Sequence, residues 1–508
     1  MRHADGARRP GASQNRAFVI APPSGPAASA GEQSASAGGE TSAALPLFAA
    51  GDVSHERPQA KELRLVSAEM PSVPEPIARL AMNGQPVTLD TAIAISLARD
   101  PTLVAQRATE PVAHAAYHVA EVYPWNPFVQ VAVLPYARDR EGDVLAVNHY
   151  VWLMQTIELA HQQRYREASA AAAWGQVRWT IVQAELTSVA QTERLYFTAL
   201  YQRELRDLAR RAATLNEELL GVVQRQFKAG LATAVEQTNA KVAMRQSDVQ
   251  AQMAEANYRT AVLALQRQLN LRSDEPVVLL GDLSGFTWQP IMDETSPLPG
   301  GPMTLRTAET LAADLAQNRP DVLAARNGVS MARANANLAR ANQVQNVSIG
   351  PFYERDESGT VFAGFRTQMN LPIWDNGSAL TAQRRAEQNL QWTTYDQLRA
   401  RAEVEAGTAI ERYERARRMV LQNSADQVGI DEAELQEIKQ QFIAGQARIL
   451  DVFNVQNSLL QQQRTYYDLL NEIALAAADV TLMAGLPPAR VVNATSGRPR
   501  EFHALPMP

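Results

Sequence analysis

The chain of 508 residues contains no cysteine, few aromatic residues and no long apolar run. The absence of cysteine excludes disulfides, thiolate metal sites, cysteine nucleophiles and a lipoprotein acylation site. No stretch of roughly 18 apolar residues is present, so we expect no transmembrane helix. The net charge of −6 gives no reason to expect a nucleic-acid partner.

Motifs for catalysis are absent as well. The sequence has no Gly-x-Ser-x-Gly, no His-Glu-x-x-His and no phosphate-binding loop. Its carboxylates are spread along segments that we interpret as solvated helical faces. We therefore predict that the protein is not an enzyme and that it uses no cofactor.

What the sequence does contain is a repeat. Phe227-Lys-Ala-Gly230 returns 215 residues later as Phe442-Ile-Ala-Gly445, and Leu97-Ala-Arg-Asp-Pro101 returns as Leu315-Ala-Gln-Asn-Arg-Pro320. Landmarks that keep a nearly constant offset indicate duplication of a unit of about 185 residues. Each unit is predicted to contain a long helix, two strands, a very long helix, a turn and another long helix.

The predicted helices are unusually long. The first begins at Leu89-Asp90 and runs to about Val122, before Pro124. No proline interrupts residues 160–228, a helix on the order of 100 Å long. Apolar residues spaced by about 3.5 predict helices that pair as left-handed coiled coils. Three such seams are Leu205, Leu208, Ala212, Leu215, Leu219 and Val222; Val235, Val242, Val249, Ala256 and Leu263; and Val452, Val455, Leu459, Tyr466, Leu469, Ile473, Ala476, Val480 and Met483.

The predicted strands form one hairpin in each half. Residues 128–136 and 144–157 flank a charged turn, and residues 361–371 alternate between apolar and polar. One face carries Val361, Ala363, Phe365, Thr367, Met369 and Leu371, and the other carries Phe362, Gly364, Arg366, Gln368 and Asn370. Such alternation is typical of a barrel strand with lipid outside and water inside. A soluble amphipathic hairpin is the alternative, but the flanking helices are far too long to cover it.

Four strands are too few to close a barrel. Open sheet edges are not tolerated in lipid, and the smallest outer-membrane barrels have about eight strands. The chain must therefore associate with copies of itself, and three copies supply twelve strands. The long helices would continue the tube away from the membrane.

These elements divide the chain into five regions. We predict a disordered segment at 1–60, a first repeat at 61–272, a linker at 273–304, a second repeat at 305–487 and a tail at 488–508. The hairpins of strands occupy 128–157 and 346–373, and the long helical hairpins occupy 160–272 and 379–486.

Over residues 88–487 this pattern resembles the TolC-type outer-membrane efflux proteins. The resemblance rests on the paired Phe-x-Ala-Gly-x-Ala turns with Glu236 or Asp451 six residues after the glycine, on Arg319-Pro-Asp321, and on Leu371-Pro-Ile-Trp-Asp-Asn-Gly377. The last segment is similar to one in the CzcC/CusC-like heavy-metal branch, whereas Gln155–Leu159 departs from the expected proline-containing version.

The resemblance implies a homotrimer with a twelve-stranded β-barrel in the outer membrane of a Gram-negative-type bacterium and an α-helical coiled-coil barrel in the periplasm. It implies a passive exit duct of a tripartite efflux system, whose partners are a periplasmic adaptor (membrane fusion protein), an inner-membrane pump and outer-membrane lipid. The exported solute is left open between metal ions and organic compounds.

The resemblance also implies roles for residues at the periplasmic tip. The two turns would contact the adaptor through Lys228, Gly230, Leu231, Thr233, Gly445, Gln446 and Arg448. Asp451 matches an acidic lumen-ring position, Asn454 stands where a second acid is often found, and Glu236 matches an acidic position in tip contacts. Independently of the resemblance, Glu236 and Asp451 are placed to cap the helices that begin there.

His114, His118 and Glu121 have the spacing of metal ligands on one helical face. Histidine pairs at this spacing are mostly incidental, so these three residues are weak candidates for a metal site. Nothing else in the sequence suggests one.

A non-channel structural or adaptor-like coiled-coil protein is the alternative function. Arg8 and Arg9 precede an apolar run too short for an ordinary secretion signal, which favours this alternative unless the start site is misplaced or export uses an atypical leader. An adaptor, however, carries split lipoyl-like β segments around a single coiled-coil hairpin. Two duplicated hairpins of helix and two of strand favour the channel.

Overall fold

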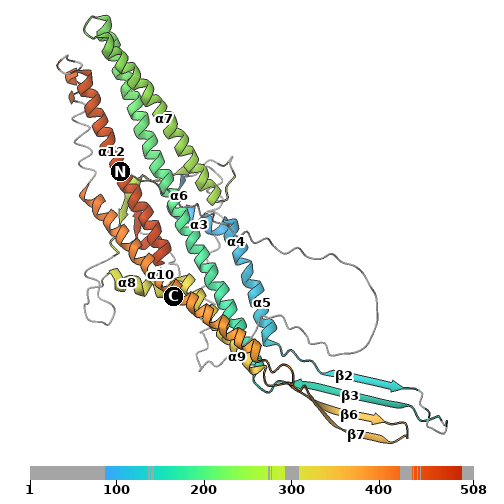
Figure 1. Ribbon diagram of the computed structural model, residues 1–508. Coiled ribbons are helices and arrows are strands. Elements are labelled where there is room, and N and C mark those ends of the chain that lie inside the picture. Colours follow the sequence, from blue (N-terminus) through green and yellow to red (C-terminus); the bar gives the residue numbers. More distant parts are fainter. Residues whose placement is uncertain are drawn as a thin grey trace, which may run out of the picture. The chain divides into compact units, whose positions relative to one another are not determined.

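A computed structural model describes residues 86–494, except for 136–137, 139–141, 143, 273–274, 276, 292–307, 424–436, 439, 443, 445 and 447. The predictions for residues 1–60, for much of the linker and for most of the C-terminal tail lie outside the described residues, as does Gly445. Figure 1 shows the arrangement of the helices and strands.

The single helix expected over Leu89–Val122 is instead three helices, and that prediction was wrong. They are α3 (Leu89–Arg99), α4 (Pro101–Arg107) and α5 (Thr109–Glu121). The first break follows from Pro101, because a proline disfavours helical geometry at the residue before it. Asp100 has ψ 115°, and its carboxylate accepts a hydrogen bond from the Thr102 N–H at 2.9 Å, which caps α4.

Five long helices contain more than half of the described residues. They are α6 (Gln162–Lys228), α7 (Ala234–Gln268), α9 (Pro320–Ala341), α10 (Ser378–Gln422) and α12 (Ile449–Ala484), with the shorter α8 (Ala308–Gln317) before α9. The uninterrupted helix predicted over residues 160–228 is confirmed by α6. It packs against α5, α7, α9 and α12, and α10 packs against α9 and α12 (Figure 1).

The predicted strands form one antiparallel sheet. Its order is β2 (Phe128–Leu134), β3 (Asn148–Ile157), β6 (Val347–Arg355) and β7 (Val361–Met369), so β2 and β7 are the edge strands (Figure 1). The hydrogen-bonded register of β3 and β6 is interrupted opposite Pro351, which has no N–H to donate. A Cβ on Gly350 would lie 1.7 Å from the Leu153 carbonyl oxygen, so only glycine fits there.

Two small strand pairs lie against the middle of the long helices. β1 (Pro86–Val87) pairs with β4 (Val278–Leu279), and β5 (Phe286–Trp288) pairs with β8 (Val492–Ala494). Short 3₁₀ turns, η1 (Leu283–Gly285) and η2 (Pro488–Arg490), precede β5 and β8.

A buried tyrosine holds each small strand pair to a long helix. The Tyr196 hydroxyl of α6 donates toward the carbonyl oxygens of Leu280 at 2.5 Å and Val87 at 3.1 Å. The Tyr413 hydroxyl of α10 donates in the same way toward Gln289 at 2.7 Å and Val491 at 3.0 Å. Burial raises the pKa of both phenols, which keeps them protonated as donors.

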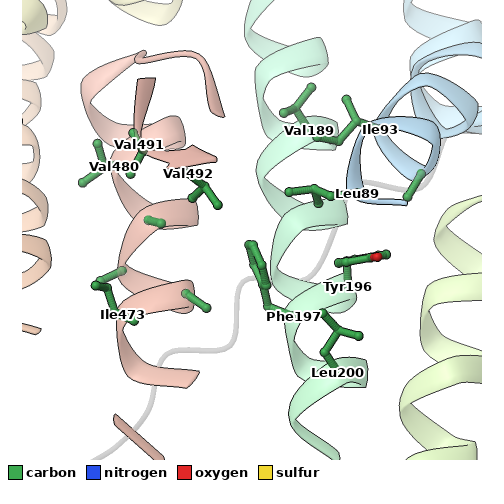
Figure 2. Packing of buried hydrophobic residues seen from close by; sticks show 14 of the residues in the cluster. Leu89, Ile93, Val189, Tyr196, Phe197, Leu200, Ile473, Val480, Val491 and Val492 are labelled. Atoms are coloured by element: carbon green, nitrogen blue, oxygen red, sulfur yellow. The ribbon is translucent and has the colours of Figure 1, made fainter. Parts of the chain in front are cut away.

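The main hydrophobic core lies at this level. It joins α3, α6, α10 and α12 to the small strands, and Figure 2 shows part of it. Leu89 and Ile93 of α3 lie beside Val189 of α6 in this cluster, and Phe197 lies on the side of α6 toward α12 (Figure 2).

Local structure recurs in the two halves of the chain. His161 and Gly377 immediately precede α6 and α10, and both have left-handed backbone conformations with φ 58° and 71°. Tyr196 and Tyr413 occupy corresponding places on the same two helices.

Glu193 is an acid inside the core. It is completely buried on α6, and neither carboxyl oxygen has a well-formed hydrogen bond to a described residue. Burial raises the pKa of Glu193 to about 8, and the nearby Thr481 hydroxyl and Arg194 charge act weakly in the opposite direction. At neutral pH the folded protein therefore keeps this carboxyl protonated.

We predict that Glu193→Gln removes a pH dependence of stability. In the unfolded chain Glu193 loses its proton above about pH 4.5, whereas the folded chain keeps it up to about pH 8. The wild-type protein should therefore lose stability as the pH rises through this window, by about 1.4 kcal/mol per pH unit. Denaturant unfolding in detergent measures the free energy of unfolding of both proteins at pH 5 and pH 8. The stability of Glu193→Gln relative to the wild type should be higher at pH 8 than at pH 5. Equal differences at the two pH values would contradict the prediction.

Candidate functional site: helix tips and a two-faced sheet

The first tip connects α6 to α7 in five residues. The Gly230 N–H donates to the Phe227 carbonyl at 3.0 Å, and the Leu231 N–H donates to the Gln226 carbonyl at 2.8 Å. These two bonds end α6 as a Schellman motif, which requires a left-handed residue between them. Gly230 supplies it with φ 73°.

Thr233 and Glu236 begin α7 as a reciprocal capping box. The Thr233 N–H donates to the Glu236 carboxylate at 2.7 Å, and the Glu236 N–H donates to the Thr233 hydroxyl at 3.2 Å. The backbone N–H and then the hydroxyl of Thr233 lower the pKa of Glu236, and the charge of Arg448 contributes in the same direction. Glu236 is therefore ionised and serves as a helix cap.

Two of these bonds recur at the second tip 215 residues later. The Gln446 N–H donates to the Gln441 carbonyl at 2.8 Å, which corresponds to the bond between Leu231 and Gln226. The Arg448 N–H donates to the Asp451 carboxylate at 3.1 Å, which corresponds to the bond between Thr233 and Glu236. The capping role expected of both acids is confirmed.

The two tips are joined by a small hydrophobic cluster. It contains residues of α6, α7, α12 and the segment before the second turn, namely Leu219, Leu220, Val223, Ala240, Phe442, Ile449 and Val452. Leu231, by contrast, is 80% exposed, and Lys228, Gln446 and Arg448 are also exposed. Asp451 and Asn454 are exposed one turn apart on α12. The structure thus brings the described tip residues to one end of the helices, where the side chains of Lys228, Leu231, Thr233, Gln446 and Arg448 are exposed.

The predicted coiled-coil seams differ in their surroundings. On α12, Val452, Leu459, Ile473 and Val480 are buried within the chain. On α7, the side facing α6 is formed by other residues, and the entire predicted seam is exposed: Val235, Val242, Val249, Ala256 and Leu263. A stripe of valines at heptad spacing is thus left without a partner among the described residues.

One face of the sheet is almost entirely apolar and exposed. Directly opposed residues of antiparallel strands place their side chains on the same face, so the register assigns every residue to a side. The apolar face carries the exposed residues Val129, Val131, Val133, Val151, Leu153, Ile349, Tyr353, Val361, Phe365 and Met369. The alternation predicted for residues 361–371 is seen in β7, which ends at Met369, and extends across all four strands. Phe365 has the largest exposed fraction of these residues, 80%.

The opposite face is mixed. It carries polar residues, among them Gln130, Asn148, Ser348, Glu354 and Gln368, as the alternation predicted. It also carries an aromatic cluster around Arg366 that the alternation did not predict. The members of that cluster come from strands that are not neighbours, so only the register reveals it.

The weak metal candidates form an aromatic cluster instead of a metal site. The His118 Nδ1 lies 2.8 Å from the Glu121 carboxylate, and the His114 ring packs edge-on against His118 and tilted against Trp174. The hydrogen bond from His118 lowers the pKa of Glu121. In the part of the chain that the structure describes, no group of three or more histidine, aspartate or glutamate side chains is arranged to hold a metal ion.

Comparisons with known proteins identify the fold. No protein-family model matches the sequence. No curated protein matches it either. In addition, none of the described helices combines the length and the apolar character needed to cross a membrane.

The solved structures that are similar to this chain include outer-membrane channels. A structure of CusC, described in terms of transmembrane channel formation, has a TM-score of 0.61 at 14% identity, over 78% of this chain and 91% of CusC. The outer membrane protein VceC of Vibrio cholerae has a TM-score of 0.60 at 15% identity, over 78% of this chain and 96% of VceC. The open MtrE outer membrane channel of Neisseria gonorrhoeae has a TM-score of 0.59 at 19% identity, over 78% of this chain and 88% of MtrE. The protein has the TolC-type outer-membrane channel fold, as the sequence resemblance predicted.

The tip glycine gives a test with a matched control. Gly230→Ala should lower the free energy of unfolding by about 1–2 kcal/mol, because a Cβ is strained in the left-handed conformation. Gly221→Ala, nine residues earlier inside α6, should raise it by about 1 kcal/mol, because alanine is the better helix former and a Cβ there meets nothing closer than 3.8 Å. Denaturant unfolding measures both. A Gly230→Ala protein as stable as the wild type would show that the turn does not depend on this conformation.

Proposed function

We propose that the protein is the outer-membrane channel of an export system and works as a homotrimer. The observation that carries this proposal is the two-faced sheet with two open edges. An exposed face of valine, leucine and phenylalanine is costly in water and favourable in lipid. The outer backbone groups of β2 and β7 would then lie in lipid unpaired, which is not tolerated.

Twelve strands from three copies would satisfy these edges. β7 of one protomer would pair with β2 of the next, and the closed barrel would have no edge. The exposed seam on α7 supports the same association, because heptad-spaced valines bury well against a neighbouring helix. The sheet edges and the exposed seam on α7 thus both support association with further copies of the chain.

We infer that the two halves arose by duplication. The recurring hydrogen bonds at the tips, the left-handed residues before α6 and α10, and the paired tyrosines support this inference. A duplicated chain in a trimer gives six similar helical hairpins around one axis, which suits a tube.

We propose that the tips face the periplasm and contact an adaptor, with an inner-membrane pump delivering the solute. Their exposed side chains, above all Leu231, support this role, because an apolar side chain at a helix tip has nothing to cover it within the chain. The chain would then be a passive duct without catalytic residues.

The first test concerns membrane insertion. Phe365→Arg should destabilise the inserted barrel by about 2–4 kcal/mol, because its side chain would face lipid near mid-strand. Gln368→Arg, on the other face of the same strand, should be tolerated. The yield of protein in the outer-membrane fraction and the mass of the detergent-extracted particle measure the effect, with a trimer expected for the wild type. A soluble monomer would end the proposal.

The second test concerns the acidic tip of the lumen. Three copies of Asp451 around a narrow pore would attract cations through a focused field. Asp451→Asn should lower the cation preference in planar bilayers without unfolding the protein, since the asparagine oxygen can still accept the Arg448 N–H. Asn454→Asp adds an acid one turn further on and should raise the preference. If neither variant changes the selectivity, Asp451 is a helix cap only.

A further inference from the structure

The aromatic cluster on the mixed face of the sheet joins residues of β3 and β7, which are separated by β6. The Arg366 Cζ of β7 lies 3.6 Å from the centre of the Trp152 ring of β3. The Trp152 ring is stacked on Tyr150, with centroids 4.7 Å apart and planes at 21°. β6 runs between β3 and β7, so Arg366 must reach over it.

Two glycines make this reach possible. Gly350 of β6 is paired with Arg366 and contributes no side chain between the guanidinium and the indole. Gly364 of β7 is paired with Phe352, whose ring carbon lies 3.0 Å from where a Cβ on Gly364 would be. Phe352 therefore leans toward β7 and leaves the space over Gly350 to Arg366.

The composition of this face is unusual for a water-filled lumen. Aromatic residues are 6% of the chain, yet five of them lie on this one face: Phe128, Tyr150, Trp152, Phe352 and Phe362. A polar wall would serve water and inorganic ions equally well. Flat rings with one stacked guanidinium are instead suited to a flat organic solute.

We propose that Tyr150, Trp152 and Arg366 form a binding station for aromatic organic anions that pass through the channel. The planar guanidinium stacked on Trp152 keeps its N–H edges free to donate two parallel hydrogen bonds to a carboxylate or sulfonate. The ring of the solute then stacks beside it on the aromatic wall. This assignment rests on the proposed channel function, which puts the mixed face toward the lumen.

Equilibrium binding to the detergent-extracted protein tests the station without requiring conduction. The probes are 2-naphthalenesulfonate and methanesulfonate, which share a charge and differ in the ring. We expect naphthalenesulfonate to bind more tightly, and both Trp152→Leu and Arg366→Gln to weaken it about two- to fivefold. Arg366→Lys keeps the charge but not the planar stack, and should retain only part of the preference for the aromatic anion.

Arg355→Gln is the matched control. It removes the same charge from a neighbouring strand on the apolar face, near the hairpin end, and should leave binding unchanged. Equal affinity for the two anions, or equal loss in Arg355→Gln and Arg366→Gln, would overturn the proposal.

Single-channel recording separates this proposal from the channel function. Naphthalenesulfonate should shorten the open time of wild-type channels more than methanesulfonate does, and the difference should shrink in Arg366→Gln. Binding without any conductance would refute the channel function, and with it a station on a transport path, and would leave only a binding site for aromatic anions. Conductance with identical block by both anions in the wild type would refute the station alone.

Discussion

Backbone hydrogen bonding is the constraint on which the arrangement depends. A helix satisfies its own N–H and C=O groups, so α6 can extend for 67 residues without any neighbour to pair its backbone. A sheet of four strands cannot do this, because β2 and β7 each leave one edge unpaired. The apolar face of this sheet is unfavourable in water. In lipid, the unpaired backbone groups of the two edges are not tolerated. The proposed trimer would supply the strands that pair these two edges.

The long helices show the same incompleteness in their side chains. The seam on α12 is covered by the chain itself, whereas the equally regular seam on α7 is exposed. Both seams have the period that pairs helices, so the difference lies in which neighbours the chain provides. Unpaired strand edges and an uncovered helical seam thus point to one solution, since a symmetric assembly supplies a strand and a helix at once.

Polar groups are placed differently in three regions of the molecule, namely the core, the helix tips and the sheet. In the core, Glu193 is held neutral by burial, because a charged carboxylate without a partner would cost far more than keeping the proton. At the tips, Glu236 and Asp451 lie at the surface, and the carboxylate of each accepts a backbone N–H and caps its helix. On the sheet, Arg366 lies over the Trp152 ring, and no acidic side chain among the described residues forms an ion pair with it.

Much of the fold was predictable from local sequence. The uninterrupted helix over residues 160–228, the alternating strands and the capping acids at 236 and 451 each depend on residues within a few positions of one another. The break of the first helix at Asp100 was missed although its signal, Pro101, is local. The exposure of the α7 seam could not be read from its period, because a heptad stripe looks the same whether its partner is in the chain or outside it.

The sequence by itself determined the kinds of elements, their order, their repetition and the alternation along single strands. Only the tertiary structure decided which strands are neighbours, that Tyr196 and Tyr413 hold the small strand pairs, and that Trp152 and Arg366 meet over Gly350. The physical reason is range. Helix caps, turns and strand alternation are set by contacts between near neighbours in the chain, whereas Trp152 and Arg366 are more than 200 residues apart and meet only when the register of three strands is fixed.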